Sequence, residues 1–134
     1  MRILAIDFGL RRFGLAVSDE GRSFAFPRGV MAVDGSLVAR LAELCRSEKI
    51  SEIIVGWPRS LSGQEGAQAV AVACFIERLR AVVSLPIRTQ DERFSTALAR
   101  RKLQTSGRRA SLDAAAAATI LESYLVRSRY NSNA

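Results

Sequence analysis

The hydrophobic pattern at the start of the chain predicts three consecutive β-strands. A short apolar run ends at Asp7, and a second run, Phe13–Ser18, follows a connection that contains Gly9. Two such runs joined by a tight turn are typical of a β-hairpin. Phe24–Val33 predicts a third strand, in which Pro27 favours an edge position or a bulge because proline has no N–H to donate. The chain therefore opens with strands alone.

Helices and strands alternate in the rest of the chain. Apolar residues recur at helical spacing from Leu37 to about Lys49, and Glu52–Trp57 then reads as a buried strand. A second helix follows, and we expect its apolar positions to lie on or beside one face: Val70, Ala73, Cys74, Leu79 and Val83. Pro86–Thr89 is the last short strand.

The carboxyl-terminal third predicts two more helices. A basic helix is expected from about Ser95 to Gln104, and a polar loop over residues 105–110. Ser111 then suits the N-cap of an alanine-rich helix, Leu112–Val126, and residues 127–134 read as a frayed polar tail.

This order of elements predicts one α/β domain that spans residues 1–134. Three strands without helices, followed by alternating strands and helices, imply a mixed sheet covered by helices. No apolar run approaches the roughly 20 residues that cross a bilayer, and no signal-peptide core follows Met1. We expect a cytoplasmic protein without a membrane partner.

The residue composition narrows the chemistry that the chain can perform. It contains no histidine, which excludes histidine-based acid–base catalysis and histidine metal ligands. Cys45 and Cys74 lie too far apart in sequence for a CxxC pair, so we expect both to be reduced core residues. Any catalysis must then rely on carboxylates, acting through a hard metal ion that prefers oxygen ligands.

The positive charge points to a polyanionic partner. The net charge is +7, and 18 of the 20 basic residues are arginine, whose planar fork suits phosphate. The enrichment alone could also reflect a GC-rich genome, but the placement of the charges favours nucleic acid. Residues 93–109 contain no acid and six basic residues: Arg93, Arg100, Arg101, Lys102, Arg108 and Arg109. Two further arginines, Arg11 and Arg12, follow Asp7 closely. We expect all eight to contact nucleic acid.

Carboxylates far apart in sequence are placed where a sheet could bring them together. Asp7 ends the first strand, Asp91 and Glu92 follow the last strand, and Asp113 begins the closing helix. Such a cluster repels itself unless a cation neutralises it, and two divalent ions held by shared carboxylates can activate water against a phosphodiester. Each residue also has a purely structural interpretation. Asp7 suits a turn, and the others suit acids at helix starts.

Four segments of the chain resemble, in order, the motifs of the RuvX/YqgF family. They are Asp7-Phe-Gly-Leu-Arg-Arg-Phe-Gly14 with Ala16-Val-Ser-Asp19, Val55-Gly-Trp-Pro58 with Gly63 and Gly66, Asp91-Glu-Arg-Phe-Ser-Thr96, and the alanine-rich helix from Leu112 to Leu125. The resemblance implies an RNase H-like fold, a mixed five-stranded sheet whose first three strands are antiparallel. It also implies an endonuclease that uses Mg²⁺ or Mn²⁺.

The same resemblance assigns roles to residues and leaves alternatives open. Asp7, Glu92 and Asp113 would be both catalytic residues and metal ligands, with Asp91 as a less favoured member of the site. Gly63 and Gly66 suit turns or a loop that closes over substrate. Processing of the 5′ end of pre-16S rRNA is favoured over resolution of Holliday junctions in DNA, for which a homodimer would be needed. An inactive RNA-binding factor for ribosome assembly is the alternative of another class, and the retained carboxylates speak against it.

Overall fold

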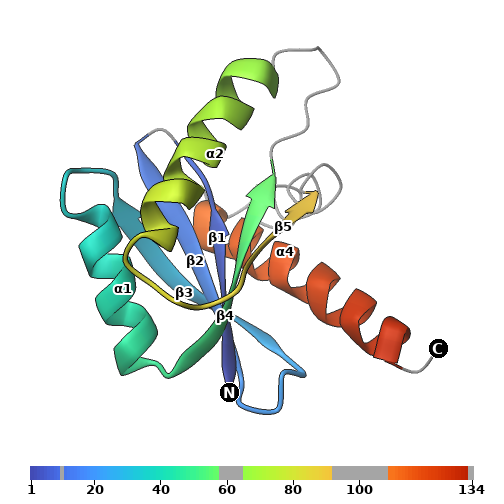
Figure 1. The fold of residues 1–134 in the computed structure, drawn as a ribbon. Helices are drawn as coiled ribbons and strands as arrows, with labels where there is room; N and C mark the ends of the chain where they lie inside the picture. The colour runs from blue at the N-terminus through green and yellow to red at the C-terminus, as the bar shows by residue number, and fades with distance from the viewer. Residues whose placement is uncertain (10, 58–64, 92–108, 133–134) are drawn as a thin grey trace.

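The computed structural model describes residues 1–9, 11–57, 65–91 and 109–132. Within these ranges the chain forms five strands and three helices around a single sheet (Figure 1). In chain order the elements are β1 (Arg2–Asp7), β2 (Arg12–Ser18), β3 (Ala25–Ala32), α1 (Leu37–Ser47), β4 (Ile50–Trp57), α2 (Glu65–Arg80), β5 (Ile87–Asp91) and α4 (Arg109–Ser132).

The sheet is mixed, as the order of elements predicts. Its strands follow one another as β3-β2-β1-β4-β5. The first three strands are antiparallel, whereas β4 runs parallel to β1 and β5 runs parallel to β4. Each parallel pairing needs a crossover, which α1 and α2 supply. The carboxyl ends of β1, β4 and β5 therefore share one edge of the sheet, called here the carboxyl edge.

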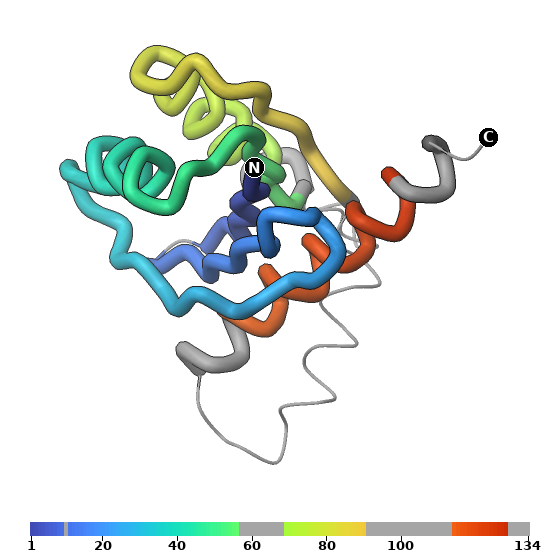
Figure 2. The backbone as a smooth tube through the Cα atoms, turned by 90° about the horizontal axis from the view of Figure 1, so that it is seen from below, coloured from blue at the N-terminus to red at the C-terminus, as the bar shows by residue number. Residues whose placement is uncertain are grey.

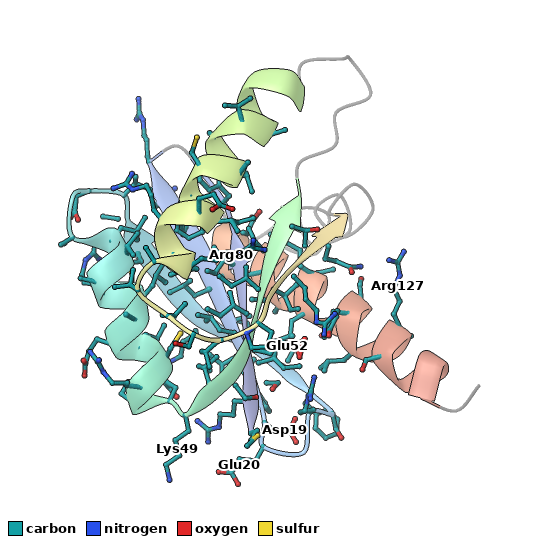
Figure 3. The ribbon with its side chains drawn as sticks, in the orientation of Figure 1. Asp19, Glu20, Lys49, Glu52, Arg80 and Arg127 are labelled. Carbon is teal, nitrogen blue, oxygen red and sulfur yellow. The ribbon has the colours of Figure 1, made fainter. Side chains whose placement is uncertain are left out.

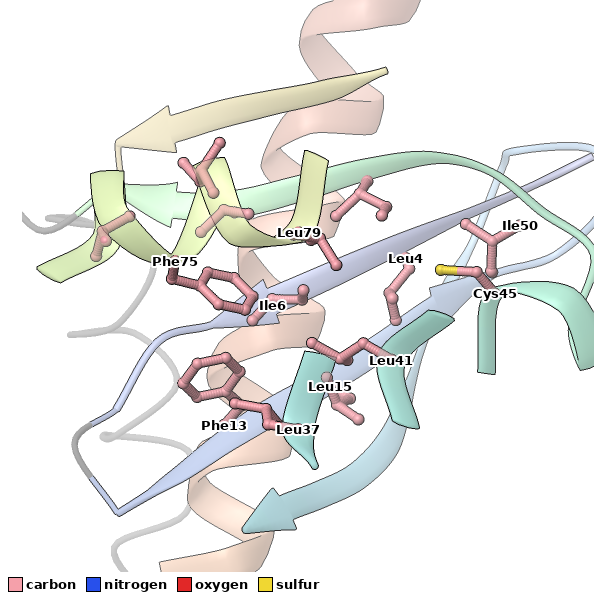
Figure 4. Packing of buried hydrophobic residues seen from close by; sticks show 14 of the residues in the cluster. Leu4, Ile6, Phe13, Leu15, Leu37, Leu41, Cys45, Ile50, Phe75 and Leu79 are labelled. Atoms are coloured by element: carbon pink, nitrogen blue, oxygen red, sulfur yellow. The ribbon is translucent and has the colours of Figure 1, made fainter. Parts of the chain in front are cut away.

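Alternate residues of the central strands enter two separate cores. Leu4 and Ile6 of β1 pack with residues of α1 and α2, while Ile3 and Ala5 pack with residues of α4. Figure 2 shows α1 and α2 on one side of the sheet and α4 on the other. Figure 4 shows the first core from close by, where Phe13, Leu41, Phe75 and Leu79 fill the space above the strands. The period of two along each strand thus decides which helix a side chain meets.

Strand β3 confirms the interpretation of Pro27. It is an edge strand, and its pairing with β2 shifts register between Leu15 and Ala16, where Ala16 faces Pro27. Phe24 and Phe26 are exposed beside and on this strand. A proline and a register shift both interrupt the hydrogen-bonding edge that a second chain could otherwise extend.

Several predictions about the helices are wrong. The buried face of α2 consists of Val72, Phe75, Ile76 and Leu79, whereas Val70 and Ala73 are exposed. Cys74 is an exposed free thiol, and only Cys45 is the reduced core residue expected of both. Gly66 is the second residue of α2, so it does not belong to a loop.

The closing helix is longer than predicted. It begins at Arg109, inside the expected loop over residues 105–110, and it continues to Ser132 instead of ending at Val126. The alanine run packs closely on the sheet, as its small side chains favour, and Ala114, Ala116, Ala117 and Ala118 are all buried. No helix in the described part of the chain is both long and apolar enough to span a membrane.

Candidate active site at the carboxyl edge

Asp7 is the last residue of β1. The end of β1 lies at the carboxyl edge (Figure 1). Asp7 is paired in register with Gly14 of β2 on one side. On the other side, the neighbouring Ile6 is level with Val55 of β4, which is level with Thr89 of β5. The position of Asp7 is therefore fixed by the centre of the sheet, where strands hold each other from both sides.

The alternation along β1 places Asp7 on the α4 side of the sheet. Ile3 and Ala5, four and two residues earlier, belong to the core that α4 covers. Asp7 itself is half-buried, and it has a polar or electrostatic partner within the structure. A carboxylate at this depth is partly desolvated, which strengthens its attraction to a cation.

An aromatic cluster anchors the end of β1 just after Asp7. The ring of Phe8 lies 4.9 Å from the ring of Phe13 and 5.9 Å from that of Phe75, which itself packs edge-on against Phe13 at 4.8 Å. Phe13 and Phe75 are buried, so β1, β2 and α2 are joined at this point. This cluster could not be predicted from the sequence, because its members come from three separate parts of the chain.

Gly9 completes the turn that follows the aromatic anchor. A Cβ atom at this position would overlap the carbonyl oxygen of Arg12. Only glycine lets the two backbone segments approach this closely. The turn between β1 and β2 is therefore tight because residue 9 has no side chain.

We expect Gly9→Ala to lower the free energy of unfolding by about 1–3 kcal/mol, because a backbone atom must move to make room for the methyl group. The same shift should displace Asp7 and weaken any metal-dependent rise of the melting temperature. Chemical denaturation and thermal melts with and without Mn²⁺ would measure both effects. Gly35→Ala is the matched control, since a Cβ at Gly35 meets nothing within 4 Å. Equal stability of the two variants would show that the close approach at Gly9 is unimportant.

The second candidate segment reaches the same edge two strands away. Strand β5 ends at Asp91, whose backbone is paired with that of Trp57. Because β4 lies between β1 and β5, their backbones are about 10 Å apart. Gln90 is buried. Glu92, the favoured ligand, and Gly63 of the predicted loop lie outside the described residues, so their placement stays a prediction.

The third candidate, Asp113, lies in the first half of α4 but not in its first turn. The helix begins at Arg109, so Asp113 is its fifth residue and Ser111 its third. Ser111 is therefore not the N-cap that the sequence predicts, and no acid occupies the first turn of α4. The stabilisation of an acid by the helix dipole is confined to that first turn. The purely structural explanation of Asp113 is weakened accordingly.

The direction of α4 brings its beginning toward the carboxyl edge. Tyr124, near its other end, donates a hydrogen bond to Glu52, whose backbone is level with Ile3 at the start of β1. Asp113 lies eleven residues before Tyr124, or about 16 Å along the helix axis. Asp7 lies four residues after Ile3, or about 13 Å along the strand. Figure 1 shows α4 starting behind the upper part of the sheet and running downward past it.

Few of the predicted nucleic-acid-binding residues lie where the structure describes their side chains. Arg11 is exposed beside the Asp7 turn, and Arg12 is half-buried and has a partner. Arg109 is the first residue of α4. The others lie outside the described residues: Arg93, Arg100, Arg101, Lys102 and Arg108.

The donor chemistry at the carboxyl edge can be compared with the needs of a metal ion. Among the described side chains no group of three acidic, cysteine or histidine residues forms a metal cage. Of the three expected ligands, only Asp7 has a described side chain. Its oxygen donors and the absence of histidine from the chain suit a hard cation such as Mg²⁺ or Mn²⁺.

Comparison with known proteins relates this arrangement to nucleases. A bacterial protein of Maridesulfovibrio salexigens is 39% identical over 134 residues, covering 95% of this chain and 99% of its own length. A protein of Nocardia farcinica is 40% identical over 92% of this chain and 77% of its own length. Both carry the name "Putative pre-16S rRNA nuclease".

Solved structures share the fold at much lower identity. RuvC of T. thermophilus in complex with a Holliday junction substrate matches with a TM-score of 0.64 at 20% identity, over 96% of each chain. The fowlpox virus resolvase, in a complex with Holliday junction DNA, matches with a TM-score of 0.60 at 12% identity, over 95% of this chain and 98% of its own. These likenesses confirm the RNase H-like fold. The model of the family described as "RuvX: Holliday junction resolvase" matches residues 1–127, so the chain belongs to the RuvX family.

Proposed function

We propose that residues 1–134 form one nuclease domain, a divalent-metal-dependent endonuclease that hydrolyses phosphodiester bonds in structured nucleic acid. The observation that carries the proposal is the position of Asp7, half-buried at the carboxyl edge of the central strand, with β5 and α4 leading toward the same edge. A site of this kind needs carboxylates from three elements, and the chain carries a candidate on β1, directly after β5 and on α4.

Three side chains would hold the metal, each from a different element. Asp7 would contribute from β1, Glu92 from the residue that follows β5, and Asp113 from α4. Glu92 is favoured over Asp91 because the resemblance of Asp91-Glu-Arg-Phe-Ser-Thr96 to the family motif implies the glutamate as the ligand. When bound, divalent ions of this type activate water and stabilise the leaving oxygen of a phosphodiester.

The substrate that we favour is the 5′ leader of pre-16S rRNA. Relatives at 39% and 40% identity are named "Putative pre-16S rRNA nuclease", whereas the resolvases solved with Holliday junctions are only 20% and 12% identical. Holliday junction DNA is the second candidate, supported by the likeness of fold to those resolvases. A resolvase would act as a homodimer that cuts the junction symmetrically.

The decisive experiment measures cleavage of three nucleic acids by the purified protein. Four-way DNA junctions, single-stranded RNA and a pre-16S leader are each incubated with Mg²⁺, with Mn²⁺ and with a chelator. We expect metal-dependent cleavage of the leader, abolished by the chelator. Symmetric cleavage of the junction alone would favour the second candidate, and binding without cleavage of any substrate would favour the RNA-binding assembly factor.

Binding should weaken steeply with salt, because arginines that contact phosphates release counterions. Arg100→Ala combined with Arg101→Ala should weaken binding to all sequences alike and reduce the slope of log affinity against log salt by about 1–2 units. Fluorescence anisotropy at salt concentrations from about 50 to 300 mM, where counterion release is measured, would give this slope.

The control for the salt experiment removes two arginines at the opposite edge of the sheet. Arg46 and Arg80 lie in the last turns of α1 and α2, both exposed. Arg46→Ala with Arg80→Ala changes the net charge equally and should leave the slope nearly unchanged. Equal slopes for the two double variants would mean that residues 93–109 do not track the phosphate backbone.

A further inference from the structure

A buried carboxylate outside the candidate site connects α4 to the sheet. Glu52 of β4 is 8% exposed and lies at the amino end of the strand (Figure 3). Its Oε1 accepts a hydrogen bond of 2.9 Å from Nη2 of Arg22, and its Oε2 lies 3.2 Å from Nε of Arg88. The hydroxyl of Tyr124 in α4 donates to the same Oε2. Three separate segments therefore meet at one side chain.

The chemistry of this contact makes it directional. A carboxylate at this depth would be costly without partners, and the two guanidinium groups offset its desolvation. Burial and the hydrogen bond to Glu52 raise the pKa of the Tyr124 phenol above its ordinary value. The phenol therefore remains protonated, and a donor, throughout the physiological range. Its acceptor is held by two arginines, Arg22 in the connection from β2 to β3 and Arg88 in β5, so the position of the hydroxyl relative to the sheet is fixed.

The second core forms the apolar part of the interface between α4 and the sheet. It combines small side chains, Ala117 and Ala118 on the helix and Ala5 and Ala16 on the sheet, with larger ones, Ile120, Leu121 and Leu125 on the helix and Ile3 and Ile54 on the sheet. Apolar contacts are not directional, whereas the hydrogen bond from Tyr124 joins one donor to one acceptor. A shift of α4 by one residue would move it 1.5 Å and turn it by about 100°.

We propose that the contact between Tyr124 and Glu52 sets the axial position of α4, and thereby positions Asp113 at the carboxyl edge. The part that concerns Asp113 rests on the proposed function. Tyr124 and Glu52 are positioning residues, since their contact lies near the beginnings of β1 and β4, about 16 Å along the helix from Asp113. Metal ligands tolerate displacements of only a few tenths of an ångström, so a small axial slip at Tyr124 weakens a distant metal site.

The chain contains a matched control for this arrangement. Glu48, at the end of α1, is also held by two arginines, at 3.0 Å from Nη1 of Arg2 and 2.6 Å from Nε of Arg28. Arg2 belongs to β1 and Arg28 to β3, so neither of these partners lies on α4. Glu48→Gln therefore disturbs a similar carboxylate without touching the position of α4.

The first measurement is Mn²⁺ affinity by calorimetry, with cleavage kinetics beside it. Tyr124→Phe removes the donor and keeps the ring, so the variant should fold. We expect Mn²⁺ to bind at least about 10-fold more weakly, with kcat reduced and KM for nucleic acid little changed. Glu52→Gln should behave similarly, while Glu48→Gln should keep wild-type Mn²⁺ affinity. Wild-type Mn²⁺ affinity in folded Tyr124→Phe would overturn the positioning role.

A second measurement follows α4 itself and requires no metal. Spin labels on Cys74, exposed on α2, and on a cysteine introduced by Glu122→Cys, exposed on α4, report the distance across the sheet. With Tyr124→Phe the distance distribution should move or broaden, and with Glu48→Gln it should stay as in the wild type. An unchanged distribution in Tyr124→Phe would refute the axial role of the contact. If Asp113→Asn leaves Mn²⁺ binding intact, the assignment of Asp113 as a metal ligand fails, and the label distances still decide whether Tyr124 fixes α4.

Discussion

Asp7→Asn should reduce cleavage on the order of 10³-fold or more while leaving the metal-free protein at least as stable as the wild type. The loss is expected because Asp7 is the candidate ligand on the central strand, and residues that act as one unit fail together when one is removed. Stability should not fall, because under the proposed assignment the change removes one charge from three carboxylates that repel one another in the absence of metal.

Metal ions should reveal the same change in thermal melts. A ligand that binds only the folded state raises the melting temperature, so Mg²⁺ or Mn²⁺ should stabilise the wild type. Asp7→Asn should lose much of this response. Glu20→Gln, an exposed acid in the connection from β2 to β3, is the control of equal charge. A metal response that survives in Asp7→Asn would place the ion elsewhere in the molecule.

Asp113→Asn should abolish most turnover while nucleic acid still binds. If Asp113 were only a helix-start acid, its loss would cost at most about 0.3–1 kcal/mol through the dipole. Its place as the fifth residue of α4 makes even that cost smaller. As a ligand, it should show strong non-additivity with Asp7→Asn, since the metal site cannot be lost twice. Single-turnover cleavage by the two single variants and the double variant would measure this coupling.

Glu122→Gln provides the comparison within the same helix. Glu122 is exposed on α4, so its replacement changes the charge of the helix without affecting the carboxyl edge. We expect near-normal turnover from it. Near-normal turnover from folded, metal-saturated Asp113→Asn would reduce the proposed site to Asp7 and Glu92.

The sheet and the position of Asp7 could be predicted from the sequence because both follow from local patterns. Apolar runs fix the strands to within about two residues, and Pro27 alone indicates an edge. Once β1 and β5 are taken as parallel members of one sheet, their carboxyl ends must share an edge. The prediction of Asp7 at that edge needs no knowledge of side-chain contacts.

The helices were harder to predict because their signals are weaker. Helix α2 is apolar on most sides, so its buried stripe of Val72, Phe75, Ile76 and Leu79 does not stand out from Val70 and Cys74. The cap signal at Ser111 was overridden because Arg109 and Ala110 are good helix formers that extend the helix toward its start. The contact between Glu52 and Tyr124 joins residues 72 apart, which no local pattern could indicate.

The packing of the first strand against the last described helix also affects how the protein folds during its synthesis. Ile3, Ala5, Ala16 and Ile54 are covered by α4, and α4 is the last of the described elements to leave the ribosome. A growing chain without α4 leaves this apolar face open to water and contact with chaperones. Under the proposed assignment, a growing chain without α4 contains the ligand Asp7 but lacks the ligand Asp113. On that assignment, a nascent chain surrounded by ribosomal RNA would be unable to cut it until the closing helix had folded onto the sheet.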